Sequence, residues 1–289
     1  MPRGLNPYDE ARLQGRLWTP DVVRPALWLD ASDLSTITVA TGVSEWRDKS
    51  GNERNFSQGT SANQPDFTPN RLNSNPAVSF NGSQWLTSPA AASIWNFLHN
   101  TTGSTVFAIW QAGNNSNPNT FYTLMGNNGL ASANIGFYII YDDRLASARN
   151  DRMIILISRG VAGSQAVLNQ TADNAHPANT PVLLTHFADP NNATASARSI
   201  LQINQTVVTN NADTNAPSAS NASFALQIGA GGNNSGPTTG YIAEILVFSG
   251  ILNSLNRLKI QGYLAHKWGL RNALVAAHPF INRPPLIGD

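Results

Sequence analysis

Carboxylate pairs are the first chemistry to look for in this chain, because hydrolysis of a glycosidic bond needs two carboxyl groups about 5 to 10 Å apart. The sequence holds only four glutamates, at positions 10, 45, 53 and 244, and it has no Glu-x-Asp-x-x-Glu run that would place several carboxylates along one strand. Only Glu244 lies in a strongly apolar strand segment, and that segment offers no second carboxylate. We therefore expect Glu244 to be structural, accepting hydrogen bonds or pairing with an arginine, and we predict no catalytic residues and no enzyme activity.

Metal-binding side chains are present but scattered. Asp142 and Asp143 end an apolar segment and could offer oxygens to Ca²⁺, but such a site needs six to eight ligands, and Arg144 follows directly, so a solvated strand end is the favoured interpretation. Histidines lack the i, i+4 spacing of helical zinc sites, and the chain has no cysteine to supply a thiolate. We therefore predict no metal site and no cofactor, with His266 packed or capping beside a helix. The histidines are His99, His176, His186, His266 and His278.

Other site motifs are missing or have simpler explanations. The chain contains neither a Gly-x-Ser-x-Gly elbow nor a Walker loop. The glycine-rich stretch from Gly229 to Gly236 lies between two apolar segments and opens no helix, which predicts a long, mobile hairpin loop and no phosphate cradle. Aromatic side chains could stack on sugar rings if they were exposed, although most aromatics in a β-sandwich belong to its core. These candidates are Trp18, Trp85, Trp95, Tyr122 and Tyr138.

The charge content excludes two classes of partner. The net charge is +1, only 12% of the residues are charged, and the chain has three lysines. Binding to nucleic acid or to an anionic membrane needs clustered Lys and Arg, so neither is expected. No apolar run reaches the ~18 residues of a membrane span, and the first residues lack the apolar core of a signal peptide. We therefore expect no membrane insertion and no classical secretion.

Short apolar segments joined by polar turns must position these side chains. Many such segments without helices between them are typical of an antiparallel sandwich, whereas a parallel sheet needs crossover helices. Asn81-Gly82 is a strong hairpin marker, so the segments on either side of it are expected to pair. The predicted strands are Ala26–Asp30, Val43–Trp46, Asn75–Gly82, Gln84–Thr87, Thr105–Trp110, Phe121–Met125, Ile135–Tyr141, Met153–Ser158, Pro181–Phe187, Ser199–Asn204, Phe224–Gly229 and Tyr241–Phe248.

One long helix is predicted to follow the last strand. It starts at Asn253 or Ser254, which are good N-caps, and ends at Gly269. Its apolar stripe comprises Leu255, Leu258, Leu264 and Trp268, with Lys259 and Lys267 mostly off that stripe. Gly262 inside the helix predicts a close approach to the sheet.

The two ends of the chain are predicted to lie outside the sandwich. Residues 1–24 form an N-terminal arm or anchor with a short helix from Asp9 to Leu17, residues 25–270 form the sandwich, and residues 271–289 form an extended, proline-rich tail. Two interpretations of the N-terminal segment stay open. It is either an anchor held by a partner or a strap packed on its own domain.

Three groups of motifs resemble the laminin-G-like, concanavalin A-like jelly-roll domains of bacteriophage virion proteins and bacterial surface proteins. These are Leu27-Trp-Leu-Asp-Ala-Ser32; Trp46-Arg-Asp-Lys-Ser-Gly-Asn52 with Pro76-Ala-Val-Ser-Phe-Asn-Gly82; and Gly240-Tyr-Ile-Ala-Glu-Ile with Gly262-Tyr-Leu-Ala-His-Lys-Trp-Gly269. The resemblance covers about residues 26–270 and implies an all-β jelly-roll sandwich with one C-terminal helix. Where such domains often carry an Arg-Phe-Asp-Gly turn, this chain has Ser79-Phe-Asn-Gly82, so no cation or glycan site is transferred from the family.

The resemblance, together with the lack of a signal peptide and of cysteine, implies a structural protein on the surface of a bacteriophage virion. It would be a capsid decoration or tail-associated protein, made in the host cytoplasm and bound to other virion proteins through its terminal arms. We expect a homo-oligomer, a trimer rather than a dimer, with weak adhesion to host-surface glycans as an added role. The alternative function is a carbohydrate-binding lectin module, and a polysaccharide hydrolase is the least favoured hypothesis.

Overall fold

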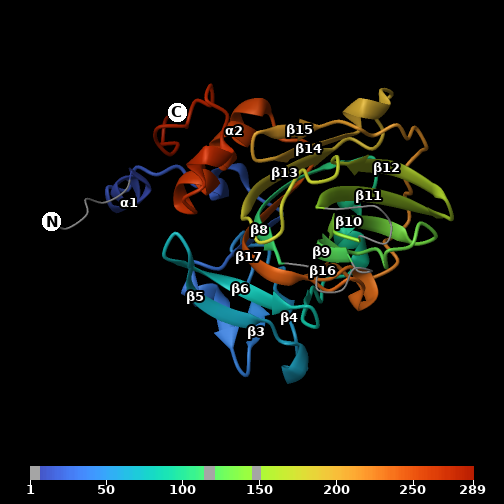
Figure 1. Cartoon of the computed structure of the whole chain (residues 1–289), viewed down its shortest axis with the longest axis horizontal. Coiled ribbons are helices and arrows are strands. Elements are labelled where there is room, and N and C mark those ends of the chain that lie inside the picture. Colours follow the sequence, from blue (N-terminus) through green and yellow to red (C-terminus); the bar gives the residue numbers. More distant parts are fainter. Residues whose placement is uncertain (1–6, 114–120, 145–150) are drawn as a thin grey trace.

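Two antiparallel β-sheets packed face to face make up most of the molecule (Figure 1). The computed structural model describes residues 7–113, 121–144 and 151–289. Within them the chain is an all-β sandwich with a C-terminal helix, as the sequence predicts. The helices are α1 (Pro7–Leu13) and α2 (Ser254–Lys267), and the 3-10 turns are Pro20–Val23, Leu34–Thr36, Ser61–Asn63, Ala92–Leu98, Ala195–Ala197, Gly232–Asn234 and Arg271–Ala273.

The helix-covered sheet carries α2 on its outer face. Its central strand β17 pairs on one edge with β8, and on the other edge with β6 along its first half and with β1 along its second half. The strands follow the spatial order β15 (Thr206–Val208), β14 (Ser199–Ile203), β13 (Val182–Ala188), β8 (Ser104–Ala112), β17 (Thr239–Ser249), β6 (Asn75–Asn81) and β5 (Asp66–Leu72), with β1 (Leu27–Asp30) beside β17.

The opposite sheet is built from longer strands at one end and very short ones at the other. Its long pairs β10–β11 and β11–β12 follow one another along the chain. Its spatial order is β12 (Ser164–Gln170), β11 (Arg152–Val161), β10 (Ile135–Asp142), β9 (Phe121–Gly126), β16 (Gln227–Ile228), β7 (Leu86–Thr87), β4 (Phe56–Ser57), β3 (Val43–Trp46) and β2 (Ile37–Val39).

The main core fills the space between the sheets, because alternate side chains of each strand point inward. Trp46, Phe56, Trp95, Trp110 and Phe137 are fully buried there. A second apolar layer lies between the helix-covered sheet and α2, where outward-facing side chains of β8 and β17 meet the helix. The two sheets and α2 therefore form three packed layers, and α2 belongs to the core of the fold.

Two turns differ from their predictions. Asn81-Gly82 does not close a hairpin, because β6 belongs to the helix-covered sheet and β7 to the opposite sheet, so this turn carries the chain across the sandwich. The stretch Gly229–Gly236 likewise joins β16 to β17 in different sheets. It is not a loose hairpin loop, because its first four residues are buried and Gly231 pairs with Ser235.

Helix α2 starts where the sequence predicts, with the Asn253 side chain accepting a hydrogen bond from the backbone N–H of Asn256 at 2.9 Å. The predicted stripe is wrong at Leu255, which is exposed, while Lys259 and Lys267 are buried. Both sides of the second half of the helix are covered, because the C-terminal segment packs against the side that faces away from the sheet. A Cβ on Gly262 would meet Phe280, so the close approach is to that segment and not to the sheet.

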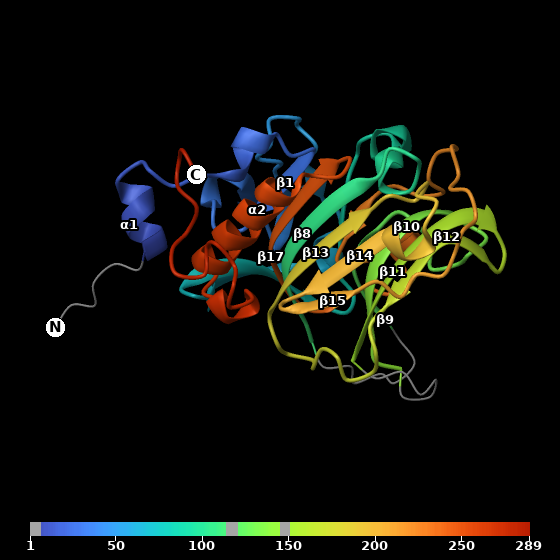
Figure 2. The ribbon, with the colours of Figure 1, turned by 90° about the horizontal axis from the view of Figure 1, so that it is seen from above.

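The two ends of the chain hold each other. Leu17 pairs with Leu286, the Trp18 N–H donates to the Pro285 carbonyl at 3.1 Å, and the Ile287 N–H donates to the Arg16 carbonyl at 2.8 Å. Both ends lie beside α2 at one end of the molecule (Figure 2). The N-terminal helix is shorter and earlier than predicted, ending at Leu13. These contacts match the strap interpretation of the N-terminal segment; contact of either arm with a partner stays a prediction.

Candidate functional site

Two carboxylates face each other where β6 gives way to β1 along the edge of β17. Asp30 ends β1 and Glu244 lies on β17, and the two residues are direct cross-strand partners. The register between β17 and β8 shifts between Ile242 and Glu244, which marks a bulge at this junction. Directly opposed residues of an antiparallel pair lie close together, so the fold brings together the carboxylate pair that the sequence of either strand alone does not contain.

Glu244 is fully buried, and its carboxylate is held by donors from two elements. The indole N–H of Trp28 donates to its Oε1 at 2.8 Å, and the indole N–H of Trp268 donates to its Oε2 at 2.6 Å. The ammonium of Lys267 also donates to Oε2, at 2.7 Å. Glu244 thus accepts hydrogen bonds as expected, but its cationic partner is a lysine and not the predicted arginine.

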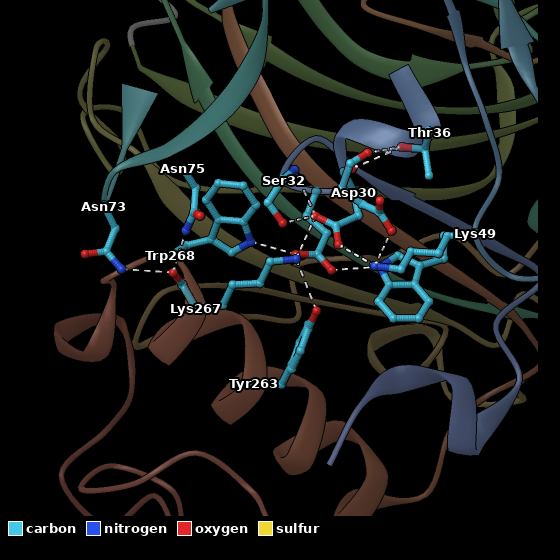
Figure 3. Close-up of polar contacts among 12 residues, drawn as sticks. Asp30, Ser32, Thr36, Lys49, Asn73, Asn75, Tyr263, Lys267 and Trp268 are labelled. Carbon is cyan, nitrogen blue, oxygen red and sulfur yellow. Dashed lines mark hydrogen bonds and ion pairs between the residues drawn. The ribbon is translucent and has the colours of Figure 1, made fainter. Parts of the chain in front are cut away.

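Lys267 bridges the two carboxylates. Its Nζ lies 2.6 Å from Oδ1 of Asp30 as well as 2.7 Å from Glu244, and it also donates to the Tyr263 hydroxyl at 3.1 Å. Tyr263 and Lys267 are one helical turn apart on α2, so they share a face. The Lys267 carbonyl accepts from the side-chain amides of Asn73 and Asn75, which fixes the end of α2 at the cluster (Figure 3).

Lys49 supplies a second cation at the solvent side. Its Nζ lies 3.0 Å from Asp30 and 3.0 Å from Asp33, and 4.5 Å from the centre of the Trp28 ring. The turn that carries Lys49 is shaped by Asp48, whose carboxylate accepts from the backbone N–H of Trp28 and of Ser50. We call Asp30, Lys49, Glu244 and Lys267 the ion cluster.

The protonation states follow from burial and pairing. Burial raises the pKa of Glu244, yet its three partners are all donors, so the group that fits this geometry is the carboxylate. The two ammonium groups hold the pKa of Asp30 below its usual range against the opposing effect of burial, and the two carboxylates raise the pKa of Lys267. The two carboxylates and two ammoniums of the ion cluster therefore balance at neutral pH.

A pocket of about 490 Å³ opens over the ion cluster. Its floor is buried, whereas the side chains of Lys49 and Asp33 are 31% and 29% exposed and therefore reach the pocket's solvent. Helix α1 forms one wall, where the centres of the Tyr8 and Tyr263 rings lie 5.9 Å apart. We call this the charged pocket. Its lining residues are Tyr8, Arg12, Leu17, Thr19, Trp28, Asp30, Ser32, Asp33, Leu34, Ser35, Lys49, Tyr263 and Lys267.

The geometry favours recognition over hydrolysis. A general acid must offer a proton to the substrate, and a nucleophile must reach it. Both oxygens of Glu244 already accept hydrogen bonds deep in the protein, and both oxygens of Asp30 face ammonium groups. Rim groups such as Asp33, Lys49 and Ser32 instead present acceptors and donors beside aromatic rings, which is the pattern that binds hydroxyl-rich ligands.

The other predicted site residues lie elsewhere. Asp142 is buried and forms a two-pronged ion pair with Arg144, at 2.7 and 2.9 Å, so the solvated strand end was wrong for this residue. Among residues 7–113, 121–144 and 151–289, no three His, Asp or Glu side chains gather as metal ligands would. Within the same ranges, no helix is long and apolar enough to cross a membrane.

The histidines and the candidate stacking aromatics are mostly core residues. All five histidines are buried, and burial lowers the pKa of His186 to about 3 and that of His176 to about 4. The His266 ring lies 2.8 Å from the Phe280 carbonyl, which ties α2 to the C-terminal segment. Of the five candidate stacking aromatics, only Trp85 is half-exposed. The buried ones are Trp18, Trp95, Tyr122 and Tyr138.

Comparison with known proteins identifies the fold. No family model and no curated sequence matches the chain. A Trypanosoma rangeli sialidase in complex with 2,3-difluoro-KDN matches with a TM-score of 0.53 and 14% identity over 85% of this chain. The botulinum neurotoxin serotype D ligand binding domain in complex with N-acetylneuraminic acid matches with a TM-score of 0.50 and 12% identity over 84% of this chain. This chain spans only 33% and 52% of those two chains, and at such low identity the likeness concerns the β-sandwich alone.

The sequence alone did not reveal the ion cluster, although it carried a usable signal. Asp30, Glu244 and Lys267 each sit among apolar neighbours in a chain with only 12% charged residues. A charge inside a core segment must be paired, so three such positions in one chain predict that they pair with one another. Four of the motif segments, Leu27–Ser32, Trp46–Asn52, Gly240–Ile245 and Gly262–Gly269, each supply one residue of this cluster, whereas Pro76–Gly82 supplies none.

Proposed function

We propose that this chain is a non-catalytic carbohydrate-binding module that holds a hydroxyl-rich sugar in the charged pocket. The observation that carries the proposal is the pairing of half-exposed Asp33 and Lys49 above aromatic walls in a pocket of about 490 Å³. Small-molecule sites of ~300–1,000 Å³ combine apolar walls with a few fixed polar groups. Sugar hydroxyls both donate and accept, so a carboxylate beside an ammonium can serve two neighbouring hydroxyls.

The solved neighbours support this choice over a purely structural role. The toxin domain is described as a ligand binding domain in complex with N-acetylneuraminic acid, and the sialidase was solved with a difluorinated nononic acid. Both solved proteins thus hold a sugar acid, and both contain a sandwich like this one. The proposal for this chain rests on its own pocket, because the likeness to them is one of fold.

A glycan array followed by calorimetric titration tests the proposal. Wild-type protein should bind a set of neutral glycans, and Asp33→Asn should weaken that binding about tenfold or more, because a hydrogen bond to a charged group contributes roughly 1.5–3 kcal/mol. Asp66→Asn is the matched control, since Asp66 is exposed on β5 away from the pocket. An array without hits, or equal losses in both variants, would refute carbohydrate binding at this site.

The hydrolase hypothesis has its own test. Release of reducing sugar from a polysaccharide that disappears in Glu244→Gln would show catalysis by the ion cluster. We expect no release from the wild-type protein, because neither buried carboxylate is free to transfer a proton or attack.

The second candidate function is a surface protein of a bacteriophage virion, attached to capsid or tail proteins through its terminal segments as a trimer. Large apolar side chains are strongly exposed on both segments, with Leu13 at 66%, Val22 at 63% and Ile287 at 69%. Single exposed apolar residues are ordinary, but three on the two predicted arms favour contact with a partner there. A protein that stays monomeric in analytical ultracentrifugation and does not bind depleted virions or capsid protein would contradict this candidate.

A further inference from the structure

A groove separates the first half of α2 from the outer face of β13, β14 and β15. Figure 2 shows the helix lying along these strands. The groove has a volume of about 350 Å³ and is distinct from the charged pocket, with which it shares no lining residue. We call it the Arg257 groove. It is lined by Thr185, Phe187, Ile200, Gln202, Val207, Ser254, Arg257, Leu258 and Gln261.

The floor of the groove is apolar at one end and amide-rich at the other. Phe187 and Ile200 are cross-strand partners on β13 and β14, and Thr185 and Gln202 are the next outward-facing pair. The Gln261 side chain donates to the Thr185 hydroxyl and to the Gln202 amide oxygen, each at 3.0 Å. These bonds fix the amide wall, so the groove is already shaped before any ligand enters.

Arg257 forms the opposite wall and keeps unused binding capacity. Its guanidinium lies 4.3 Å from the centre of the Phe187 ring and donates to the Leu252 carbonyl and to the Ser254 hydroxyl. Within the part of the chain that the structure describes, no aspartate or glutamate lies within ion-pair distance of Arg257. A guanidinium has five donors, so three remain available in a fixed, planar arrangement.

A half-buried cation without a counter-ion is a costly arrangement unless an anion can enter. Arg257 is half-buried, and this burial lowers the pKa of its guanidinium. A carboxylate matches the fork of donors and would restore charge balance. The apolar side chains of Ile200 and Val207 line the same groove and suit a sugar ring, and amide and hydroxyl groups line the rest.

We propose that the Arg257 groove binds a carboxylated pyranose, such as a hexuronic acid, with the carboxylate on Arg257 and the ring against Ile200 and Val207. The size of the groove, near the lower end for small-molecule sites, fits a single sugar unit. This second site goes beyond the function proposed above and does not depend on the charged pocket.

The experiment titrates the 289-residue protein with D-glucuronic acid. Binding is monitored through the chemical shifts of amide-labelled protein. We expect shifts confined to β13, β14, β15 and the first half of α2, and at least tenfold weaker binding of D-glucose. Arg257→Gln should weaken D-glucuronic acid binding at least tenfold, and Arg257→Lys should lie between wild type and Arg257→Gln because it keeps the charge without the fork. Circular dichroism melting confirms that each variant is folded.

Two matched controls make the result decisive. Arg71→Gln also removes a guanidinium over an aromatic ring, 4.6 Å from the centre of Tyr241, but outside the groove, and it should leave binding unchanged. Asp33→Asn, in the charged pocket, should also leave it unchanged. Equal binding of D-glucose and D-glucuronic acid, equal losses in Arg71→Gln and Arg257→Gln, or loss in Asp33→Asn would each overturn the proposal. So would Arg257-dependent binding of N-acetyl-glutamate amide without binding of D-glucuronic acid, since that result would identify an acidic peptide as the ligand.

Discussion

The two ends of α2 differ in whether their buried or half-buried cation has a carboxylate partner. At the C-terminal end, Lys267 lies between Asp30 and Glu244, and opposite charges in the ion cluster meet at 2.6 to 3.0 Å. In the first half of the helix, Arg257 lies over Phe187 without a carboxylate partner among the described residues. The first region therefore holds charges that are paired within the fold. The second leaves a guanidinium without an ionic partner, which is the group that the proposed second site would use.

The largest effect is expected where the charges are most deeply buried. Lys267→Met should lower the free energy of unfolding by about 3 to 5 kcal/mol, because it leaves the carboxylate of Glu244 buried without a cation. Urea denaturation measures this change. The double variant Lys267→Met, Glu244→Gln should recover part of the loss, since Asp30 still has Lys49. A loss below about 1 kcal/mol in the single variant would mean that the cluster doesn't stabilise the fold.

A variant in the middle of α2 tests how closely the C-terminal segment packs against the second half of this helix. A Cβ on Gly262 would lie 2.6 Å from the Cβ of Phe280, so Gly262→Ala must displace that segment. We expect a net destabilisation of about 1 to 3 kcal/mol from overpacking, despite the better helix propensity of alanine. Gly59→Ala is the control, because a Cβ there meets nothing within 4 Å and the backbone isn't left-handed. Equal midpoints of thermal unfolding for Gly262→Ala and wild type would contradict the close approach.

The same glycine shows what the sequence could and could not predict. Strand periodicity and turn residues predicted the sandwich, and Asn253 predicted the start of α2, because these signals are local. The partner of Gly262 was not predictable, since it comes from the proline-rich end of the chain. The ion cluster was missed for the same reason, as Asp30 and Glu244 meet only through sheet pairing.

The strands that the sequence missed share a position in the sheets. The four outermost strands, β2, β5, β12 and β15, all escaped prediction, as did the two-residue β4. An edge strand faces solvent along one side, so it needs fewer apolar residues, and β5 even contains Pro69. Central strands such as β8 and β17 are buried almost throughout and gave the clearest patterns.

Acid should distinguish the ion cluster from the buried histidines. The pKa of Asp30 is lowered, so its stabilising contribution is present above its unfolded pKa and is lost only as the pH falls toward its folded pKa. His186 has a folded pKa of about 3 against an ordinary value of 6.5, so below pH 6.5 the unfolded chain takes up a proton that the native state refuses. The free energy of unfolding should therefore decrease as the pH is lowered from about 6.5 to 3, by up to ~1.4 kcal/mol per pH unit for this residue.

The His186→Gln variant isolates that contribution. Glutamine can keep a hydrogen bond to the Ser199 hydroxyl, which lies 3.0 Å from the His186 ring, but it cannot take up a proton. Unfolding free energies measured from pH 7 to pH 4 should therefore fall less steeply in the variant than in the wild type. An unchanged slope would assign the acid sensitivity to other groups, the ion cluster among them.

The smallest effect on stability is expected at Arg257, and it completes the contrast along α2. Arg257→Gln removes a half-buried guanidinium that has no ionic partner in the described chain, so the lost cation–π and hydrogen-bond contacts are offset by the relief of its desolvation. We expect a change in the free energy of unfolding of less than about 1 kcal/mol in urea denaturation, against about 3 to 5 kcal/mol for Lys267→Met. If D-glucuronic acid occupies the groove, it should raise the melting temperature of the wild type and not that of Arg257→Gln, because a ligand stabilises only the state that binds it. A loss at Arg257 as large as the loss at Lys267 would show that both ends of the helix serve the fold, and the contrast between them would fail.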